Sequence, residues 1–466
     1  MRRGGPCPDA AGAATADRGT ERVLPHAALA VSLAAAGLAV TVWRPLPPPA
    51  LNVPTDLDEF ASEILAAVGA YRQPRLVGAA TALLLTTATP LLVVATRAGR
   101  RMLRRLAGSR EHAPLRGGVV AAAVASATSL ATLPVDVILG YVQDGRWGFR
   151  TAPPFGWARD WFVSNGFGWL LAGLAGAGFV FVVGRWPRSW HWRLVTLGTA
   201  AVAAVTLAVP VVFEPLWLRT APLPPGTVRD AVEEVASRAG YPDAPILVGD
   251  ASRRTTRVNA YVSGLGPSRR IVLFDTLLAL PPDRVASVVA HELAHHANRD
   301  VARGVLVAAT ALLPGALLLR RVLESSWTRR ALKPRGPSDP RLVAVAAAVA
   351  AVLTTAALPV TLAISRRVEA AADHGGLELT RDPTPLVRVE RLFVIRDLAD
   401  PRPPLWATLL FASHPSPAAR IQAVVDYATR ERLPLPQRAG LVAEERADLH
   451  WRIGEQVVSR PSPEAG

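Results

Sequence analysis

The chain has 466 residues, of which 50% are hydrophobic and 19% are charged. Soluble globular proteins carry about 25% charged residues, so this composition favours a membrane protein. The formal net charge of +15 is carried almost entirely by arginine, and the single cysteine, Cys7, excludes an internal disulfide framework and a cysteine-based zinc site.

A helix that crosses a membrane needs about 20 apolar residues, and seven stretches approach or exceed that length. They are residues 26–43, 77–96, 117–140, 163–184, 194–213, 301–319 and 342–364. Buried helices of a soluble protein would account for one or two such stretches, but hardly for seven. We therefore expect a multi-pass membrane protein. The first stretch is followed by Trp43-Arg44-Pro45 in place of a small-residue cleavage site, so we expect it to remain as an anchor.

The basic residues gather in alternate loops. Twenty-one of them lie in the tail before the first stretch and in the loops 97–116, 185–193 and 320–341, whereas the short loops 44–76 and 141–162 hold six. Basic loops of membrane proteins lie in the cytoplasm, so this pattern places the arginine-rich loops there. A nucleic-acid-binding protein would instead gather basic residues on a soluble domain, so we expect no nucleic-acid partner. The bias toward alanine, arginine and proline is typical of high-GC bacteria and favours a bacterial cell membrane.

The polar segment 214–300 combines both kinds of secondary structure. The pattern predicts a helix over Gly226–Gly240 and another over Asp283–Asn298. Between them lie short β-like runs, at Pro245–Val248, Arg257–Ser263 and Arg270–Phe274. The last two runs are joined by Gly264-Leu265-Gly266-Pro267, which predicts a β-hairpin.

The second of these helices carries the segment His291-Glu292-Leu293-Ala294-His295. His291 and His295 are four residues apart, so their imidazoles project from one helix face and can hold one zinc ion. Glu292 is placed beside them to take a proton from an attacking water. A chance match in a chain of this composition is expected only about 0.01 times. His296 points about 100° away from His295 and is expected to be a neighbour only.

A catalytic zinc site needs a third protein ligand. Downstream candidates are His374, His414 and several acidic residues. The best segment runs from Ser365 to Asp373, where Glu369 and Asp373 share a helix face. Glu369 can bind zinc, and Asp373 can accept a hydrogen bond from a ligand histidine. The alternative is a surface acidic pair beside two arginines.

These residues carry a resemblance to the integral-membrane zinc metalloproteases of the CAAX prenyl protease type I family and their HtpX-like relatives. The shared motifs are HELAH at 291–295, Ser-Arg-x-x-Glu-x-x-x-Asp at 365–373, Ser413-His414-Pro415, Arg420-Ile421, Asn259-Ala260-Tyr261, and the run from Arg270 to Leu277. Seven spans with the metal helix between the fifth and sixth also resemble that family. The resemblance implies that His291, His295 and Glu369 bind zinc and that Glu292 is the general base.

The resemblance implies further roles around this centre. Asn259 and Ala260 would lie on an edge strand that pairs with an extended substrate backbone. His414 would stabilise the oxyanion of the tetrahedral intermediate, and Arg420 would support the site by pairing with a carboxylate. A loop histidine and a surface arginine are the alternatives for the last two.

The predicted fold is mainly α, with about seven transmembrane helices and a small α+β zincin-like catalytic domain bearing a short β-hairpin. The expected domains are an N-terminal tail (1–25), a five-helix membrane region (26–213), a metallopeptidase domain (214–300 with 365–433), two further spans with a basic loop (301–364), and a C-terminal tail (434–466).

We expect a zinc-dependent membrane endopeptidase with one zinc ion, acting on peptide or membrane-protein substrates in the bilayer, in processing or quality control. Alternatives are CAAX-type processing of lipidated C-terminal peptides and, from another class, a non-catalytic zinc-containing scaffold or transporter. Two expectations disagree on orientation. The family resemblance implies a cytoplasmic zinc site, whereas the arginine-rich loops place the zinc site on the other side.

Overall fold

The computed structural model describes residues 47–443 apart from positions 49, 52, 110, 209–213 and 265–268. In this part of the chain, six helices are long and apolar enough to cross a membrane. They are α2 (Ser62–Ala95), α4 with its continuation (Ala113–Arg146), α6 (Pro154–Arg185), α7 (Trp190–Ala208), α11 (Asp300–Leu323) and α13 (Leu342–Thr380). The protein is therefore a multi-pass membrane protein. The predicted first span, 26–43, lies outside the described residues.

Several of these helices extend beyond the apolar stretches that predicted them. The longest, α13, runs unbroken over 39 residues, so the predicted span 342–364 and the helix predicted from Ser365 form one rod. Hydropathy marks only the part of a helix that touches lipid, whereas the backbone hydrogen bonds continue past it. At about 1.5 Å per residue the rod is roughly 58 Å long. It carries Glu369 from the membrane bundle into the soluble domain.

Small residues let two of the spans pack closely. α4 proper covers Ala113–Asp136 and continues through a π-helical turn, Val137–Gln143, into α5 (Asp144–Arg146). A Cβ placed on Gly176 of α6 would lie 2.7 Å from the carbonyl oxygen of Gly117 in α4. No side chain fits in that space, so glycine is required for the contact between the two helices.

The soluble domain contains a four-stranded sheet in the order β1-β2-β4-β3. The strands are β1 (Thr220–Pro222), β2 (Ile246–Gly249), β3 (Ala260–Ser263) and β4 (Arg270–Phe274). β3 and β4 pair antiparallel with Ala260 opposite Leu273, which confirms the predicted hairpin, although most of its connection lies outside the described residues. β2 and β4 are parallel. β3 is thus an outer strand of the sheet.

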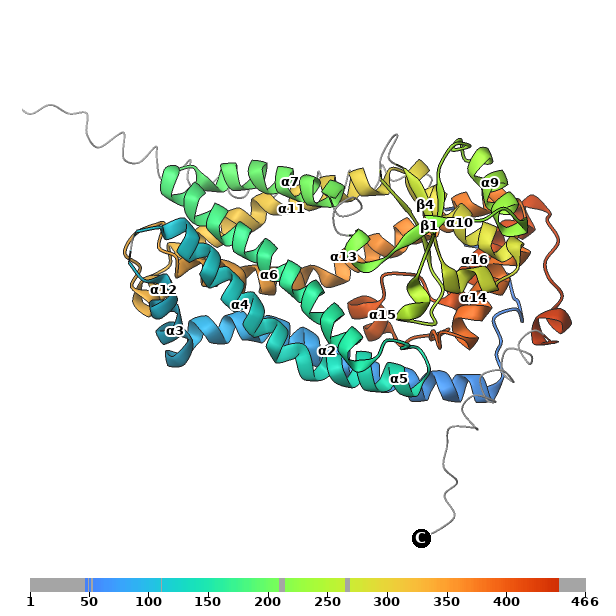
Figure 1. The fold of residues 1–466 in the computed structure, drawn as a ribbon, viewed down its shortest axis with the longest axis horizontal. Helices are drawn as coiled ribbons and strands as arrows, with labels where there is room; N and C mark the ends of the chain where they lie inside the picture. Colours follow the sequence, from blue (N-terminus) through green and yellow to red (C-terminus); the bar gives the residue numbers. More distant parts are fainter. Residues whose placement is uncertain are drawn as a thin grey trace, which may run out of the picture.

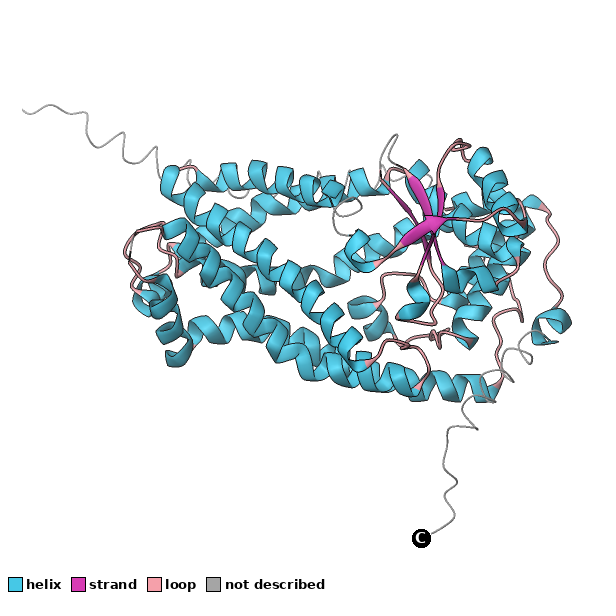
Figure 2. Cartoon of the chain, in the orientation of Figure 1, coloured by secondary structure: helices cyan, strands magenta, loops and turns pink. Residues whose placement is uncertain are grey.

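Helices of the same domain lie beside the sheet (Figure 2). They are α9 (Thr227–Arg238), α10 (Pro282–Ala297), α14 (Thr384–Ile395), α15 (Leu405–Phe411) and α16 (Pro417–Glu431). The shorter helices are α3 (Arg97–Ala107), α8 (Glu214–Trp217) and α12 (Ser326–Leu332), with 3-10 turns at Ala251–Arg253 and Asp275–Ala279. Figure 1 shows α3 and α12 at one end of the helix bundle and the sheet with α10 at the other.

Candidate metal centre and substrate cleft

α10 has an apolar face and, opposite it, a polar face that carries the two candidate ligand histidines. Val289 and Leu293 are fully buried in the core between α10, α9 and the sheet. His291 follows Val289 by two positions, and His295 follows Leu293 by two positions. Both histidines therefore lie on the opposite side of the helix. The motif therefore presents its histidines to α13, whereas its apolar residues anchor α10 to the sheet.

Two glycines bring α13 close to this face of α10. A Cβ placed on Gly375 would lie 2.9 Å from the Cβ of Ala294, and one placed on Gly376 would lie 3.1 Å from the backbone nitrogen of His291. Larger residues would force the helices apart. The close approach positions Glu369, two turns earlier on α13, opposite the histidines.

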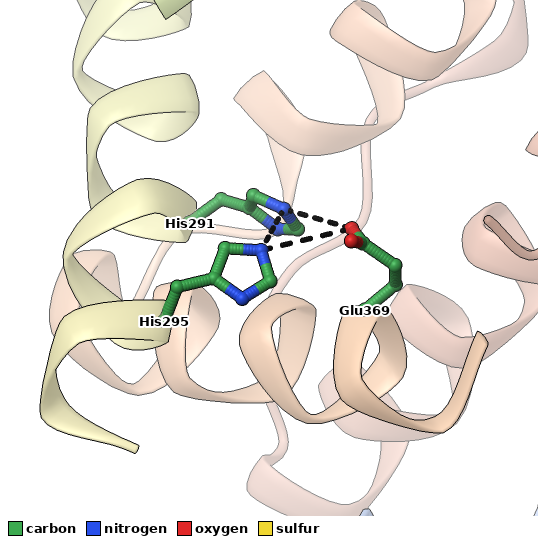
Figure 3. Close-up of side chains that lie close together, drawn as sticks. All are labelled: His291, His295 and Glu369. Carbon is green, nitrogen blue, oxygen red and sulfur yellow. Dashed lines mark hydrogen bonds and ion pairs between the residues drawn. The ribbon is translucent and has the colours of Figure 1, made fainter. Parts of the chain in front are cut away.

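The three predicted ligands converge, as Figure 3 shows. One ligand atom each from His291, His295 and Glu369 lies within 4.8 Å of the others. The two Nε2 atoms are 3.1 Å apart, and the Oε2 atom of Glu369 lies 3.2 Å from Nε2 of His291 and 3.7 Å from Nε2 of His295. Among the described residues, this is the group of histidines and acids that could hold a metal ion.

The hydrogen bonds around these ligands fit a bound cation. Nδ1 of His291 lies 2.8 Å from Oδ1 of Asp373, and Nδ1 of His295 lies 2.7 Å from Oδ2 of Asp300. Because a carboxylate accepts, each Nδ1 donates, and both Nε2 lone pairs then face one point. Oε2 of Glu369 is buried and has no hydrogen-bond donor among the described residues. Three converging electron-pair donors fit a cation, and two imidazoles with a carboxylate are a catalytic zinc set.

The neighbouring carboxylates also control the protonation of the two histidines. Burial lowers the pKa of His291, but the adjacent carboxylates of Asp373 and Glu369 outweigh it and raise the pKa to about 9. The same balance at His295, with Asp300 and Glu369, raises its pKa to about 10. Protons and a metal ion therefore compete for the same Nε2 atoms.

A cleft of about 590 Å³ opens beside the metal centre. His291, Glu292, Asn259, His414 and Arg420 all line it, so the predicted site residues come together from four segments of the chain. Burial raises the pKa of Glu292 above its ordinary value, which brings this carboxylate nearer to the range of an effective general base.

The predicted edge-strand residues lie at the margin of this cleft. Asn259 lines it, and its Oδ1 accepts a hydrogen bond of 2.9 Å from the backbone N–H of Ala260, the first residue of β3. Ala260 itself is buried.

His414 reaches the metal centre from the segment before α16. Its Nε2 atom lies 3.3 Å from Oε2 of Glu369, and its Nδ1 lies 2.9 Å from the hydroxyl of Ser413. More than half of its side chain is exposed. The other histidine considered as a ligand, His374, lies beside Glu378 and Tyr427 instead.

Arg420 on α16 supports the histidines from behind. Its Nε donates to Oδ2 of Asp373 at 2.8 Å, and its Nη1 lies 2.6 Å from Oε1 of Glu390 on α14. Arg420 thus links two buried carboxylates, Glu390 and Asp373, and Asp373 in turn fixes the imidazole of His291.

Sequence patterns missed two members of these networks, Asp300 and Glu390. Asp300 follows the motif by five residues and begins α11, so its position directly after the metal helix is a usable signal. Glu390 is a single acid within the mostly apolar face of α14, and its partner Arg420 is thirty residues away in the sequence. Its role depends on the packing of α14 against α16.

Comparisons with known proteins agree with this geometry. Residues 222–428 match the model of peptidase family M48. The chain is 28% identical over 299 residues to "Uncharacterized metalloprotease YhfN" of Bacillus subtilis, covering 63% of this chain and 70% of the relative. It is 30% identical over 186 residues to "CAAX prenyl protease 1" of Saccharomyces cerevisiae, covering 39% of this chain and 41% of the yeast protein.

A solved structure shares the overall fold. The crystal structure of S. mikatae Ste24p aligns with 85% of this chain and 98% of its own length, with a TM-score of 0.69 and 21% sequence identity. This likeness confirms the predicted arrangement of a helix bundle joined to a small α+β domain. The protein is a multi-pass membrane metallopeptidase, and its residues 222–428 match the model of peptidase family M48.

Proposed function

We propose that this protein is a zinc-dependent endopeptidase of the bacterial cell membrane that cleaves membrane-associated polypeptides in processing or quality control. The observation that carries the proposal is the convergence of Nε2 of His291, Nε2 of His295 and Oε2 of Glu369. His291 lines the same cleft as Glu292. When held by these three atoms, zinc supplies the Lewis acidity that activates a water molecule and polarises the scissile carbonyl.

The chain's own residues carry out the proton transfers. Glu292 takes a proton from the attacking water and delivers it to the leaving amine, a role suited to a carboxylate whose pKa is raised by burial. His414, exposed on the same cleft, donates a hydrogen bond to the developing oxyanion. Asp373 and Asp300 hold the two ligand imidazoles in the required tautomer throughout.

The outer strand β3 orients the substrate. Its one neighbour in the sheet is β4, and Asn259 at its start lines the cleft. An extended peptide can therefore add to β3 by backbone hydrogen bonds and pass the metal centre. Backbone pairing depends little on the side chains of the substrate, which suits an enzyme that cleaves varied substrates.

Removal and return of zinc test the proposal. Purified protein treated with a chelator should lose cleavage of a fluorogenic peptide, and one equivalent of zinc should restore it. Magnesium at the same concentration is the matched control, because it prefers oxygen ligands and should restore nothing. Full activity in chelated protein that contains no metal would contradict zinc catalysis. Absence of cleavage by the zinc-loaded protein would instead favour the alternative of a non-catalytic zinc-containing scaffold or transporter.

A second candidate, the processing of C-terminal peptides, is favoured by two arginines in the same cleft. Arg72 and Arg257 both line it. Arg72 is held by a 2.6 Å bond to the carbonyl oxygen of Leu398, and Arg257 by the hydroxyl of Tyr71. A pair of oriented guanidinium groups suits a terminal carboxylate.

The same cleavage assay separates the two candidates. A peptide with a free C-terminal carboxylate should be cleaved roughly tenfold faster than its amide in C-terminal processing. The substitution Arg257→Gln should remove that difference without slowing the amide. Equal rates for both peptides in the unaltered enzyme would favour internal cleavage.

A further inference from the structure

The end of the helix bundle farthest from the metal centre is strongly basic. This arginine-rich end comprises α3, α12 and the adjoining loops, and it lies opposite the sheet in Figure 1. Its exposed basic residues are Arg97, Arg101, Arg104, Arg105, Arg116, Arg185, Arg188, Arg321, Arg329, Arg330, Lys333 and Arg335. The described acidic residues at this end are Glu111, Glu324 and the buried Asp339, which pairs with Arg341. The end therefore carries a large excess of positive charge.

α3 turns its apolar side to the bundle and its arginines outward. Leu103 and Ala107 are buried in the core at this end of the bundle. Arg101, Arg104 and Arg105 are exposed, and no described acidic side chain lies within ion-pairing distance of them. The apolar face of α3 is therefore covered by the bundle, and its outward arginines lie beside the membrane spans, where basic residues attract anionic headgroups.

Arginines at the metal-centre end have a different environment. There, Arg229 pairs with Glu233 at 2.7 Å, Arg254 with Asp160 at 2.5 Å, and Arg438 with Glu59 at 2.6 Å. These three arginines are neutralised within the protein, whereas Arg101, Arg104 and Arg105 face outward with no ion pair among the described residues.

Aromatic residues mark the same boundary. Trp192 at the start of α7 and Trp327 in α12 are 48% and 46% exposed, and both lie near the arginines. Exposed tryptophan beside arginine occurs where a membrane span meets lipid headgroups. A soluble anionic partner would account for the charge but not for the aromatic rings.

We propose that the arginine-rich end binds the headgroups of acidic phospholipids in the cytoplasmic leaflet. Cytoplasmic leaflets carry the acidic lipids in excess and attract basic segments beside membrane spans. With this end fixed at the cytoplasm, the spans place the metal centre on the opposite side of the membrane. The enzyme then acts on polypeptides outside the cytoplasm. The lipid site itself does not depend on the proposed peptidase function.

Lipid retention tests the binding surface. In native mass spectrometry of the purified full chain, phosphatidylglycerol should remain bound more tightly than phosphatidylcholine. The variant Arg101→Gln/Arg104→Gln/Arg105→Gln should weaken phosphatidylglycerol binding at least about tenfold. The variant Arg229→Gln/Arg238→Gln/Arg438→Gln removes the same charge from the metal-centre end and should leave binding unchanged. Equal retention of the two lipids, or equal losses in both variants, would overturn the proposal.

Cysteine labelling tests the orientation separately. Cys7→Ser removes the single cysteine, and Ser109→Cys and Ser237→Cys then introduce one thiol at each end, both at exposed serines. In intact cells a membrane-impermeant maleimide should label position 237 and reach position 109 only after the membrane is opened. Labelling of position 109 from outside would overturn the orientation. Peptidase activity of both variants shows that they are folded.

Discussion

At the residue scale, the metal centre depends on side chains that touch the ligands and not the metal. Asp373 and Asp300 each accept a hydrogen bond from a ligand imidazole, at 2.8 Å and 2.7 Å. Each contact fixes the tautomer that leaves Nε2 free to bind metal. The motif HELAH names the ligands, but these carboxylates orient them.

Substitution of Asp300 tests that dependence. Asp300→Ala should weaken zinc affinity about 10- to 100-fold, because the ring of His295 loses the acceptor that orients it. Competition with a fluorescent zinc chelator measures the change. Asp283→Ala is the matched control, since Asp283 lies in the first turn of the same metal helix and contacts neither histidine. Unchanged affinity in Asp300→Ala would show that His295 is oriented by packing alone.

Protonation of the histidines predicts how metal binding depends on pH. The pKa values of His291 and His295 are raised to about 9 and about 10 in the metal-free protein, so protons occupy Nε2 at neutral pH. Zinc must displace them, and its apparent affinity should rise as the pH rises from 6 toward 9. Calorimetry in buffers with different ionisation enthalpies should detect at least one proton released per zinc at pH 7. Zinc binding without proton release would contradict these pKa values.

At the element scale, the separation of α10 and α13 decides whether the ligands meet. Glu369 lies opposite the histidines because Gly375 and Gly376 let the two helices approach closely. The ligand residues were predictable from their spacing within each helix. The contact between the helices was not, because a pair of glycines in a sequence does not specify which partner they face.

A single methyl group on α13 tests this packing. Gly376→Ala places a Cβ 3.1 Å from the backbone nitrogen of His291, so the helices must separate by a few tenths of an ångström. We expect a loss of about 1–3 kcal/mol in the free energy of unfolding together with weaker zinc binding. Gly304→Ala in α11 is the matched control, because its Cβ would meet nothing within 4 Å. Equal stability of the two variants in a thermal melt would contradict the close contact.

At the scale of the whole molecule, hydropathy located six of the spans that the structure describes. It did not locate their ends, since α13 continues as a helix far beyond its apolar part. Local patterns also predicted the β3–β4 hairpin. Contacts between distant segments, such as Arg420 with Glu390, depend on tertiary packing. The local spacing of apolar and polar residues does not predict them.

The distribution of arginine is also a feature of the whole molecule. Many of the arginines that raise the net charge to +15 are exposed at the end of the bundle farthest from the metal centre, where few acidic residues lie. We therefore relate the charge of this chain to its placement in a membrane. The helix bundle separates the arginine-rich end from the cleft beside the candidate metal centre.

We propose that Glu292 acts on a water molecule at a metal held by His291, His295 and Glu369, and substitution of Glu292 tests this most directly. Glu292→Gln removes the base and keeps the shape of the side chain, so zinc content measured by elemental analysis should stay at one per chain. Cleavage of a fluorogenic peptide by that variant should fall by at least about 100-fold. Glu369→Ala, as the comparison, should lose the metal as well as the activity. Undiminished cleavage by zinc-loaded Glu292→Gln would contradict the account.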